Sequence, residues 1–236
     1  MSKIAFLPGT LCNNAHFSHT INALQADGHQ CIDVHFGHAN CLTDMAAAVL
    51  NATQKQPCYL AAFSMGGMVA FELLRQHPET VKGVILISSN AHKDKPGGEM
   101  VRREHLAVAA EDGLEHMLRQ YYLPKYQARP TPQSQELIVE MAQQVGLEGY
   151  KAQLRVLAER PDSYQTIAVA SVPFLLISGE KDPLCPPAGQ QRMAARAKQV
   201  KQILLAEAGH FVSLDQPEAV TESLSQWLRE QQVCKD

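Results

Sequence analysis

The segment Leu60-Ala61-Ala62-Phe63-Ser64-Met65-Gly66-Gly67-Met68-Val69 decides the fold of this chain of 236 residues. An apolar run typical of a buried strand leads into Ser64, and apolar residues then recur at helical spacing. A serine on such a tight strand-to-helix turn projects its hydroxyl above the sheet, and the turn requires small residues two positions before and after it. Ala62 and Gly66 meet this requirement, in the pattern A-x-S-x-G rather than G-x-S-x-G. Ser64 could alternatively serve only as a helix N-cap.

The rest of the chain alternates between short apolar runs and longer amphipathic stretches with helical spacing. The runs that predict buried strands cover residues 3–7, 31–36, 58–63, 83–88, 173–178 and 202–206. Strands that alternate with helices form crossovers, and crossovers produce a parallel sheet covered on both faces. We therefore expect an α/β fold with a mainly parallel, doubly wound sheet of about six strands and helices on both faces.

One long interval interrupts this alternation. Residues 91–171 contain helical stripes but no strand pattern, and prolines mark the joints between the stripes. We expect residues 1–90 and 172–236 to form the core and residues 91–171 to form a helical cap or lid insertion. In the last helical stretch, Asp215 and Glu218 have the spacing of an N-cap and its return partner.

Near the N-terminus, Leu7-Pro8-Gly9-Thr10 is a strand end followed by a glycine turn. A backbone N–H from this turn could reach the anion that forms during acyl transfer, together with the N–H of the residue after the serine. The predicted donors are Met65 and Thr10, with Leu11 as the fallback. Pro-Gly is also common in ordinary turns.

Two later segments place ionisable side chains just past buried strands. Asp182 follows the strand at 173–178, and His210 follows the strand at 202–206. Functional groups of open parallel sheets gather beyond the carboxyl ends of the strands, so Ser64, Asp182 and His210 are expected at one edge. Taken singly, Asp182 could cap a helix and His210 could be a loop histidine. The order Ser, Asp, His is nevertheless the order found in sheets of this type.

Composition excludes several classes of protein. The formal net charge is −3, and no stretch has more than two adjacent basic residues, which argues against nucleic-acid binding. No apolar run approaches the length of a membrane span, and the N-terminal apolar segment is too short for a secretory signal. Six cysteines without a C-x-x-C pair favour reduced thiols, and ten histidines form no cluster with metal-ligand spacing. We expect a cytoplasmic protein without a metal site or a membrane association.

These motifs together resemble the α/β-hydrolase superfamily of serine hydrolases. The resemblance covers nearly the whole chain and rests on 7–10, 62–67, 179–186, 209–211 and 215–218. It implies that Ser64 is the nucleophile, His210 the base and Asp182 the acid that orients the base, with no cofactor. Among subgroups, the chain looks most like the small carboxylesterases that include the pimeloyl-carrier-protein methyl ester esterases.

The chain departs from that family's pattern in three ways. Most relatives have a histidine where this chain has Pro8, so the hydrogen bonds of that histidine must be absent or replaced. Ala62 stands at the usual first glycine of the serine turn. The customary first two strands are missing, which predicts six strands rather than eight.

Substrate choice is expected to depend on the cap. Its apolar side chains could line a pocket over Ser64, although most of them could equally pack the cap against the sheet. The predicted substrate-binding residues are Leu11, Phe63, Leu118, Tyr121 and Phe211. Residues 95–162 hold nine Lys+Arg and ten Asp+Glu, so no basic excess favours an acidic acyl carrier protein as a partner. Such a partner stays open if Arg102, Arg103, Arg119 and Arg155 cluster in space.

The leading hypothesis is hydrolysis of a small-molecule carboxylic ester through an acyl-enzyme intermediate. A thioesterase and a hydrolase that cleaves carbon–carbon bonds of diketones are the alternatives on the same three residues. A nucleophilic aspartate is disfavoured because position 64 is serine. A protein of another class, which binds a ligand without turnover, is disfavoured because all three residues are present.

Overall fold

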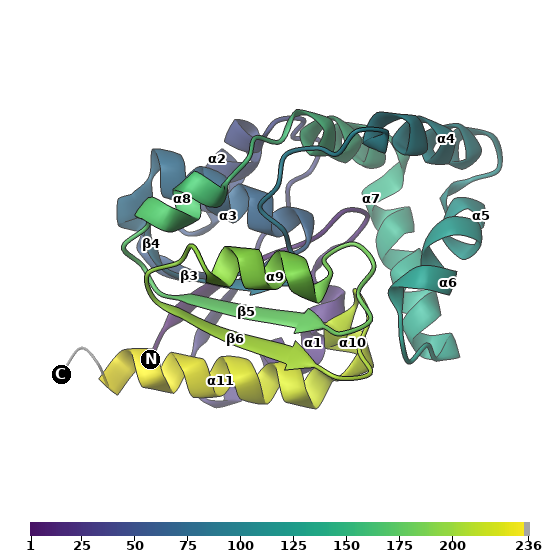
Figure 1. The fold of residues 1–236 in the computed structure, drawn as a ribbon. Coiled ribbons are helices and arrows are strands. Elements are labelled where there is room, and N and C mark those ends of the chain that lie inside the picture. The colour runs from purple at the N-terminus through teal and green to yellow at the C-terminus, as the bar shows by residue number, and fades with distance from the viewer. Residues whose placement is uncertain (234–236) are drawn as a thin grey trace.

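The computed structural model describes residues 1–233, which fold around one parallel sheet (Figure 1). The sheet has six strands in the order β2-β1-β3-β4-β5-β6, and every neighbouring pair is parallel. The strands are β1 (Lys3–Leu7), β2 (Gln30–Asp33), β3 (Cys58–Phe63), β4 (Val81–Ile87), β5 (Phe174–Gly179) and β6 (Val200–Leu205). The expected doubly wound α/β architecture is therefore confirmed.

The predicted end of the strand at residues 31–36 was wrong, because β2 stops at Asp33. β2 is an edge strand whose only partner is β1. β1 ends at Leu7, and Pro8 follows it without a backbone N–H to continue the ladder. The last bond of this edge runs from Val34 N to the Phe6 carbonyl at 3.2 Å.

Successive residues of the central strands enter two different apolar layers. In β3, Tyr59, Ala61 and Phe63 lie in one layer, while the residues between them lie in the other. Such continuous burial is typical of parallel strands that are covered on both faces.

Helices cover both faces of the sheet (Figure 1). On one face α1 (Ser18–Ala26) packs against α11 (Pro217–Val233). On the other face α3 (Met65–Gln76) packs against α2 (Leu42–Ala52) and α8 (Tyr164–Val169), and α9 (Pro187–Ala194) packs against β5. Short 3₁₀ turns cover Asn14–Phe17 and Pro78–Thr80.

The chain between β4 and β5 forms helices and no strand. α4 (Gly98–Glu111), α5 (Leu114–Met117), α6 (Leu123–Tyr126) and α7 (Pro132–Glu159) lie beyond the carboxyl ends of the strands (Figure 1). A π-helical turn, Leu118–Tyr122, joins α5 to α6, and α7 is broken at Gly146, whose φ is 71°. Because α8 packs on α3, the last part of the 91–171 interval lies with the helices that cover the sheet.

The capping box predicted for the last helix was wrong. Asp215 ends the short helix α10 (Val212–Asp215), and α11 begins two residues later at Pro217. Both carboxylate oxygens of Asp215 accept hydrogen bonds from backbone N–H groups of other loops. They are therefore not available to the first turn of α11.

Across residues 1–233, no helix combines the length and the apolar character that a membrane crossing requires.

The packing of α11 on the sheet generates a stability prediction. Trp227 is 2% exposed and lies in edge contact with Tyr59, with ring centroids 5.6 Å apart. Trp227→Ala should lower the free energy of unfolding by roughly 3–5 kcal/mol, because it leaves a cavity that the sheet cannot close. Urea denaturation followed by circular dichroism measures this change. Trp227→Phe should lose less, and an equal loss in both variants would contradict the packing argument.

Candidate active site

Ser64 occupies a strained turn between β3 and α3. Its φ and ψ are 49° and −112°, a region that a residue with a side chain rarely adopts. The turn is held because Ser64 N donates to the Ile87 carbonyl at 3.0 Å and Ser89 Oγ donates to the Ser64 carbonyl at 2.7 Å. A Cβ atom at Gly66 would lie 2.4 Å from the Leu7 carbonyl oxygen. Only glycine therefore fits the position two residues after the serine.

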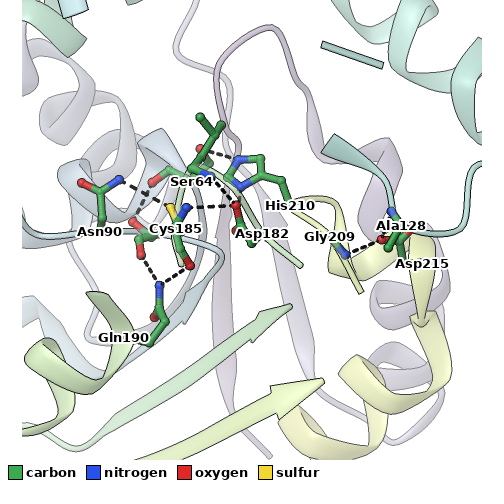
Figure 2. Close-up of polar contacts among 11 residues, drawn as sticks. Ser64, Asn90, Ala128, Asp182, Cys185, Gln190, Gly209, His210 and Asp215 are labelled. Atoms are coloured by element: carbon green, nitrogen blue, oxygen red, sulfur yellow. Dashed lines mark hydrogen bonds and ion pairs between the residues drawn. The ribbon is translucent and has the colours of Figure 1, made fainter. Parts of the chain in front are cut away.

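Ser64, His210 and Asp182 form one hydrogen-bonded chain (Figure 2). Ser64 Oγ lies 3.0 Å from His210 Nε2, and His210 Nδ1 lies 2.9 Å from Asp182 Oδ2. An ionised carboxylate can only accept, so His210 carries its proton on Nδ1 and leaves Nε2 free to accept from the serine hydroxyl. The structure thus brings together three side chains that are 28 and 146 residues apart in sequence.

Asp182 is held as a carboxylate although it is only 2% exposed. Burial acts to raise its pKa, but His210 and the backbone N–H groups of Cys185 and Leu184 together lower the pKa below the usual range. Asp182 Oδ1 accepts from Leu184 N at 2.8 Å and from Cys185 N at 2.9 Å. The turn after β5 therefore fixes the carboxylate and leaves its other oxygen for His210.

The imidazole of His210 is also buried. Burial acts to lower its pKa, and the neighbouring Asp182 carboxylate outweighs burial, so that the pKa lies above the ordinary value of 6.5. The backbone of the loop is held from the other side, because His210 N donates to the Tyr126 carbonyl at 2.8 Å. The helical segment before α7 thus contacts the loop that carries this side chain.

Asp215, the last residue of α10, is a second buried carboxylate near His210, but it does not contact the imidazole. It accepts from Gly209 N at 2.7 Å, from Ala128 N at 3.0 Å and from Arg129 N at 3.1 Å (Figure 2). These bonds join the residue before His210 to the start of the loop between α6 and α7. Asp215 therefore positions the loop, whereas Asp182 contacts the imidazole.

The turn after β1 lies beside Ser64, as the sequence predicted. A Cβ atom at Gly9 would lie 3.2 Å from the Ser64 Cβ. Within residues 1–233 the N–H groups of Thr10 and Met65 donate no hydrogen bond. Both N–H groups are therefore unpaired in this part of the chain.

Leu11, the fallback donor, does not fit that role. Its N–H donates to Gln153 Oε1 on α7 at 2.8 Å, and Gln153 is only 4% exposed. Leu11 has a φ of 56°, in the left-handed region. The sequence did not predict this contact of Gln153, because a single glutamine near Tyr150 and Leu154 in a helical segment is typical of a surface residue.

A cavity of about 320 Å³ opens onto Ser64. Four of the five predicted substrate-binding residues line it, together with Thr10 and His210: Leu11, Phe63, Leu118 and Phe211. Tyr121 does not line it, and its neighbour Tyr122 does. The π-helical turn inserts one residue relative to α-helical spacing, which turns Tyr122 inward and leaves Tyr121 beside Glu104.

Cys185 also borders this site. Its buried thiol accepts from Asn90 Nδ2 at 3.5 Å (Figure 2). Asp182, Cys185 and His210 each offer one possible metal ligand, and these donor atoms lie within 4.8 Å of one another. A cation there would replace the proton between His210 and Asp182 and so break the chain that reaches Ser64.

Comparisons with known proteins identify the family of this chain. The family model described as "Serine aminopeptidase, S33" matches residues 35–217. A protein of Yersinia enterocolitica named pimeloyl-[acyl-carrier protein] methyl ester esterase is 29% identical over 195 residues, which cover 78% of this chain and 74% of that protein.

Solved structures of two esterases superimpose on nearly the whole chain. A thermophilic esterase from Thermogutta terrifontis superimposes with a TM-score of 0.88 at 25% identity, covering 98% of this chain and 90% of that one. An esterase from Exiguobacterium antarcticum shares the fold, with a TM-score of 0.84 at 22% identity over 97% of this chain and 92% of that one. The chain combines a strained serine turn with a parallel sheet of the same fold as these esterases, and the family model matches most of its length. The chain therefore belongs to the S33 serine aminopeptidase family of α/β hydrolases and is a hydrolase that acts on ester bonds.

Proposed function

We propose that the protein hydrolyses carboxylic esters through an acyl-enzyme, with Ser64 as nucleophile, His210 as general base and Asp182 as the acid that orients it. One observation carries this proposal: the hydrogen bonds from Asp182 through His210 to Ser64 end at a cavity large enough for a small substrate.

In the first half of the reaction, Ser64 Oγ attacks the ester carbonyl carbon while its proton passes to His210 Nε2. The positive imidazolium that results is stabilised by the Asp182 carboxylate, which stays ionised. The N–H groups of Thr10 and Met65 donate to the oxyanion. Removal of one such donor in other hydrolases costs roughly 10²–10³ in turnover.

The ester carbon–oxygen bond then breaks, the leaving alkoxide takes the proton from His210, and the acyl group remains on Ser64. In the second half, the neutral His210 takes a proton from water. The water oxygen attacks the acyl carbon, and the acid leaves as Ser64 recovers its proton. These steps need no metal and no cofactor.

We further propose that the helices α4–α7, within residues 91–171, act as a cap that selects the substrate. Two contacts support this role: the Gln153 side chain accepts from Leu11 N, and the Tyr126 carbonyl accepts from His210 N. Because both loops of the site touch the cap, a change in the cap alters the cavity and the position of the base together.

An ester attached to an acyl carrier protein is a second candidate substrate, favoured by the name of the Yersinia relative. Three of the four basic side chains considered for such a partner belong to separate ion pairs, and the fourth, Arg103, is exposed and forms no ion pair within residues 1–233. Arg119 pairs with Glu115 and Glu136, Arg155 pairs with Glu159, and Arg102 lies inside the cavity beside Asp94. A small-molecule ester is therefore the leading substrate. We propose a cytoplasmic location, where reduced cysteines are the rule.

Labelling with a fluorophosphonate tests the nucleophile. The protein should take up one label at Ser64, because among the serine and threonine residues that line the cavity within residues 1–233, only Ser64 has a histidine within hydrogen-bond distance of its hydroxyl. Ser64→Ala should abolish both labelling and hydrolysis of p-nitrophenyl acetate, as judged by intact mass and absorbance. Ser223→Ala, on the far helix α11, is the matched control and should label normally. A binder without turnover would stay unlabelled.

Competing substrates test the reaction class. Because the same three residues also serve thioesterases and carbon–carbon hydrolases, acyl p-nitrophenyl esters, acyl thioesters and 1,3-diketones of matched chain length should be compared by kcat/KM. We expect the oxygen esters to be the best substrates. A preference of about tenfold or more for thioesters or diketones, equivalent to roughly 1.4 kcal/mol in the barrier, would reassign the reaction.

The pH dependence tests the acid. The base must be neutral, so kcat/KM should rise with pH through the pKa of His210, and the midpoint should lie above 6.5 because Asp182 raises that pKa. Asp182→Asn removes the carboxylate charge that raises the pKa of His210, whereas the burial that lowers this pKa remains. The midpoint should therefore move to lower pH, and kcat should fall by roughly 10³–10⁴. Asp44→Asn, in the first turn of α2, is the control and should change neither. An unchanged profile in the Asp182 variant would exclude it as the orienting acid.

A further inference from the structure

The cavity over Ser64 is not apolar throughout. Leu118, Ile138, Leu154 and Leu157 contribute apolar walls, but the same lining includes Asp94, Lys95, Arg102 and Arg160. Three of these four side chains are cationic and one is anionic. Charged groups are otherwise rare in small-molecule cavities, where a few polar groups fix the orientation of the ligand.

Two guanidinium groups share one carboxylate in this cluster. Arg102 binds both oxygens of Asp94, through Nη1 at 2.9 Å and Nη2 at 2.5 Å. Arg160 Nη1 lies 3.4 Å from Asp94 Oδ1. The three side chains are between 10% and 21% exposed. A positive charge therefore stays uncompensated in a mostly dehydrated place, which is costly unless an anion joins it.

Both arginines keep donors that no protein group uses. Arg160 donates from Nε to the His92 carbonyl at 3.1 Å and from Nη1 to the Leu157 carbonyl at 2.7 Å. Within residues 1–233, Arg160 Nη2 and Arg102 Nε have no hydrogen-bond partner. These carbonyl bonds hold the Arg160 guanidinium in place before a ligand arrives.

The directions of the pKa shifts reflect two cations that share one anion. Burial lowers the pKa of Arg160, and the nearby Arg102 adds to this effect against the attraction of Asp94. Hydrogen bonds from Arg102 lower the pKa of Asp94, so this carboxylate is ionised and already committed. Burial also lowers the pKa of His92, which keeps that side chain neutral and adds no charge.

Gly98, the first residue of α4, leaves room for this cluster. A Cβ atom at Gly98 would lie 2.8 Å from Asp94 Oδ1 and 3.1 Å from Arg102 Nη1. Glycine at the first residue of α4 therefore permits the close approach of the two side chains.

We propose that the ester substrate carries a carboxylate at the end remote from the scissile bond, which Arg102 and Arg160 bind while the apolar walls hold the carbon chain between the two groups. This inference rests on the proposed function and names its substrate class: monoesters of small dicarboxylic acids. Guanidinium groups suit a carboxylate because their paired N–H donors match its two oxygens.

The burial of the two arginines favours a small molecule over a protein surface. Their side chains are only 10–15% exposed, so an acidic face of a carrier protein cannot reach them without opening the cap. A slender chain with a terminal carboxylate can enter the cavity beside Ser64 and reach the cluster.

The test compares monomethyl succinate, monomethyl glutarate and monomethyl adipate with the uncharged dimethyl esters of the same acids. Methanol release gives kcat/KM for each. We expect the monoesters to be favoured at least about tenfold, a typical gain for a charged hydrogen-bonded pair. Arg102→Gln should reduce the ratio of kcat/KM between each monoester and its dimethyl ester to about twofold or less. Arg119→Gln, on the outer surface beside Glu115 and Glu136, is the matched control and should keep the preference.

A second measurement covers the case in which an arginine variant fails to fold. Glutarate should inhibit the wild-type protein competitively, and the neutral glutaramide should not. Equal kcat/KM for monoesters and diesters in the wild-type protein would overturn the inference while leaving the proposed esterase in place. Hydrolysis of carrier-linked esters alone would overturn it as well. If Ser64 takes up no label and no ester is cleaved, the proposed function fails and this inference fails with it.

Discussion

The two hydrogen bonds of the His210 imidazole are the interaction on which the site depends. One ring nitrogen faces the Ser64 hydroxyl at 3.0 Å and the other faces the Asp182 carboxylate at 2.9 Å. Each bond fixes the direction of the other, because the proton held on Nδ1 leaves Nε2 as the acceptor. The surrounding burial would disfavour a charged imidazole, and the adjacent carboxylate reverses that effect. The geometry therefore stabilises the protonated form of an imidazole that faces a serine hydroxyl.

The parallel sheet makes this arrangement possible. Ser64, Asp182 and His210 follow β3, β5 and β6, and the carboxyl ends of these strands meet at one edge (Figure 1). The turn after each strand then fixes the side chain or the loop that it carries. The β3 turn holds a serine in a strained conformation, and the β5 turn supplies two backbone N–H groups that donate to Asp182 Oδ1. The β6 loop is held by Asp215, which bonds the residue before His210.

The helices beyond the strand ends take part in the site directly. Gln153 accepts from the N–H of Leu11, and the Tyr126 carbonyl accepts from the N–H of His210. Asp215 in turn accepts from two N–H groups of the loop between α6 and α7. Because buried polar groups are costly when unpaired, these bonds tie the cap segment to the core. The shape of the cavity and the positions of the reacting groups are therefore coupled in one network.

Much of the fold and of the candidate site could be predicted from the sequence, because the determining signals are local. Apolar runs separated by helical stripes predicted six parallel strands, and the small residues around Ser64 predicted the turn that carries it. The positions of Asp182 and His210 after two strands followed from the same reading, since the ends of parallel strands share an edge. The strand before Asp182 is buried as predicted, whereas the strand before His210 is a partly exposed edge strand.

The tertiary structure alone decided how residues from distant segments meet. No local pattern marks Gln153 as the partner of Leu11, or assigns Asp215 to three backbone N–H groups rather than to a helix cap. Tyr122 lines the cavity in place of the predicted Tyr121, because the helix makes a wider π-helical turn at Leu118–Tyr122. The periodicity of apolar side chains does not reveal such a turn. The sharing of Asp94 by Arg102 and Arg160 likewise depends on how the end of α7 packs over the start of α4. Periodicity determines which face of an element is apolar, whereas these hydrogen bonds and ion pairs exist only after the elements have packed together.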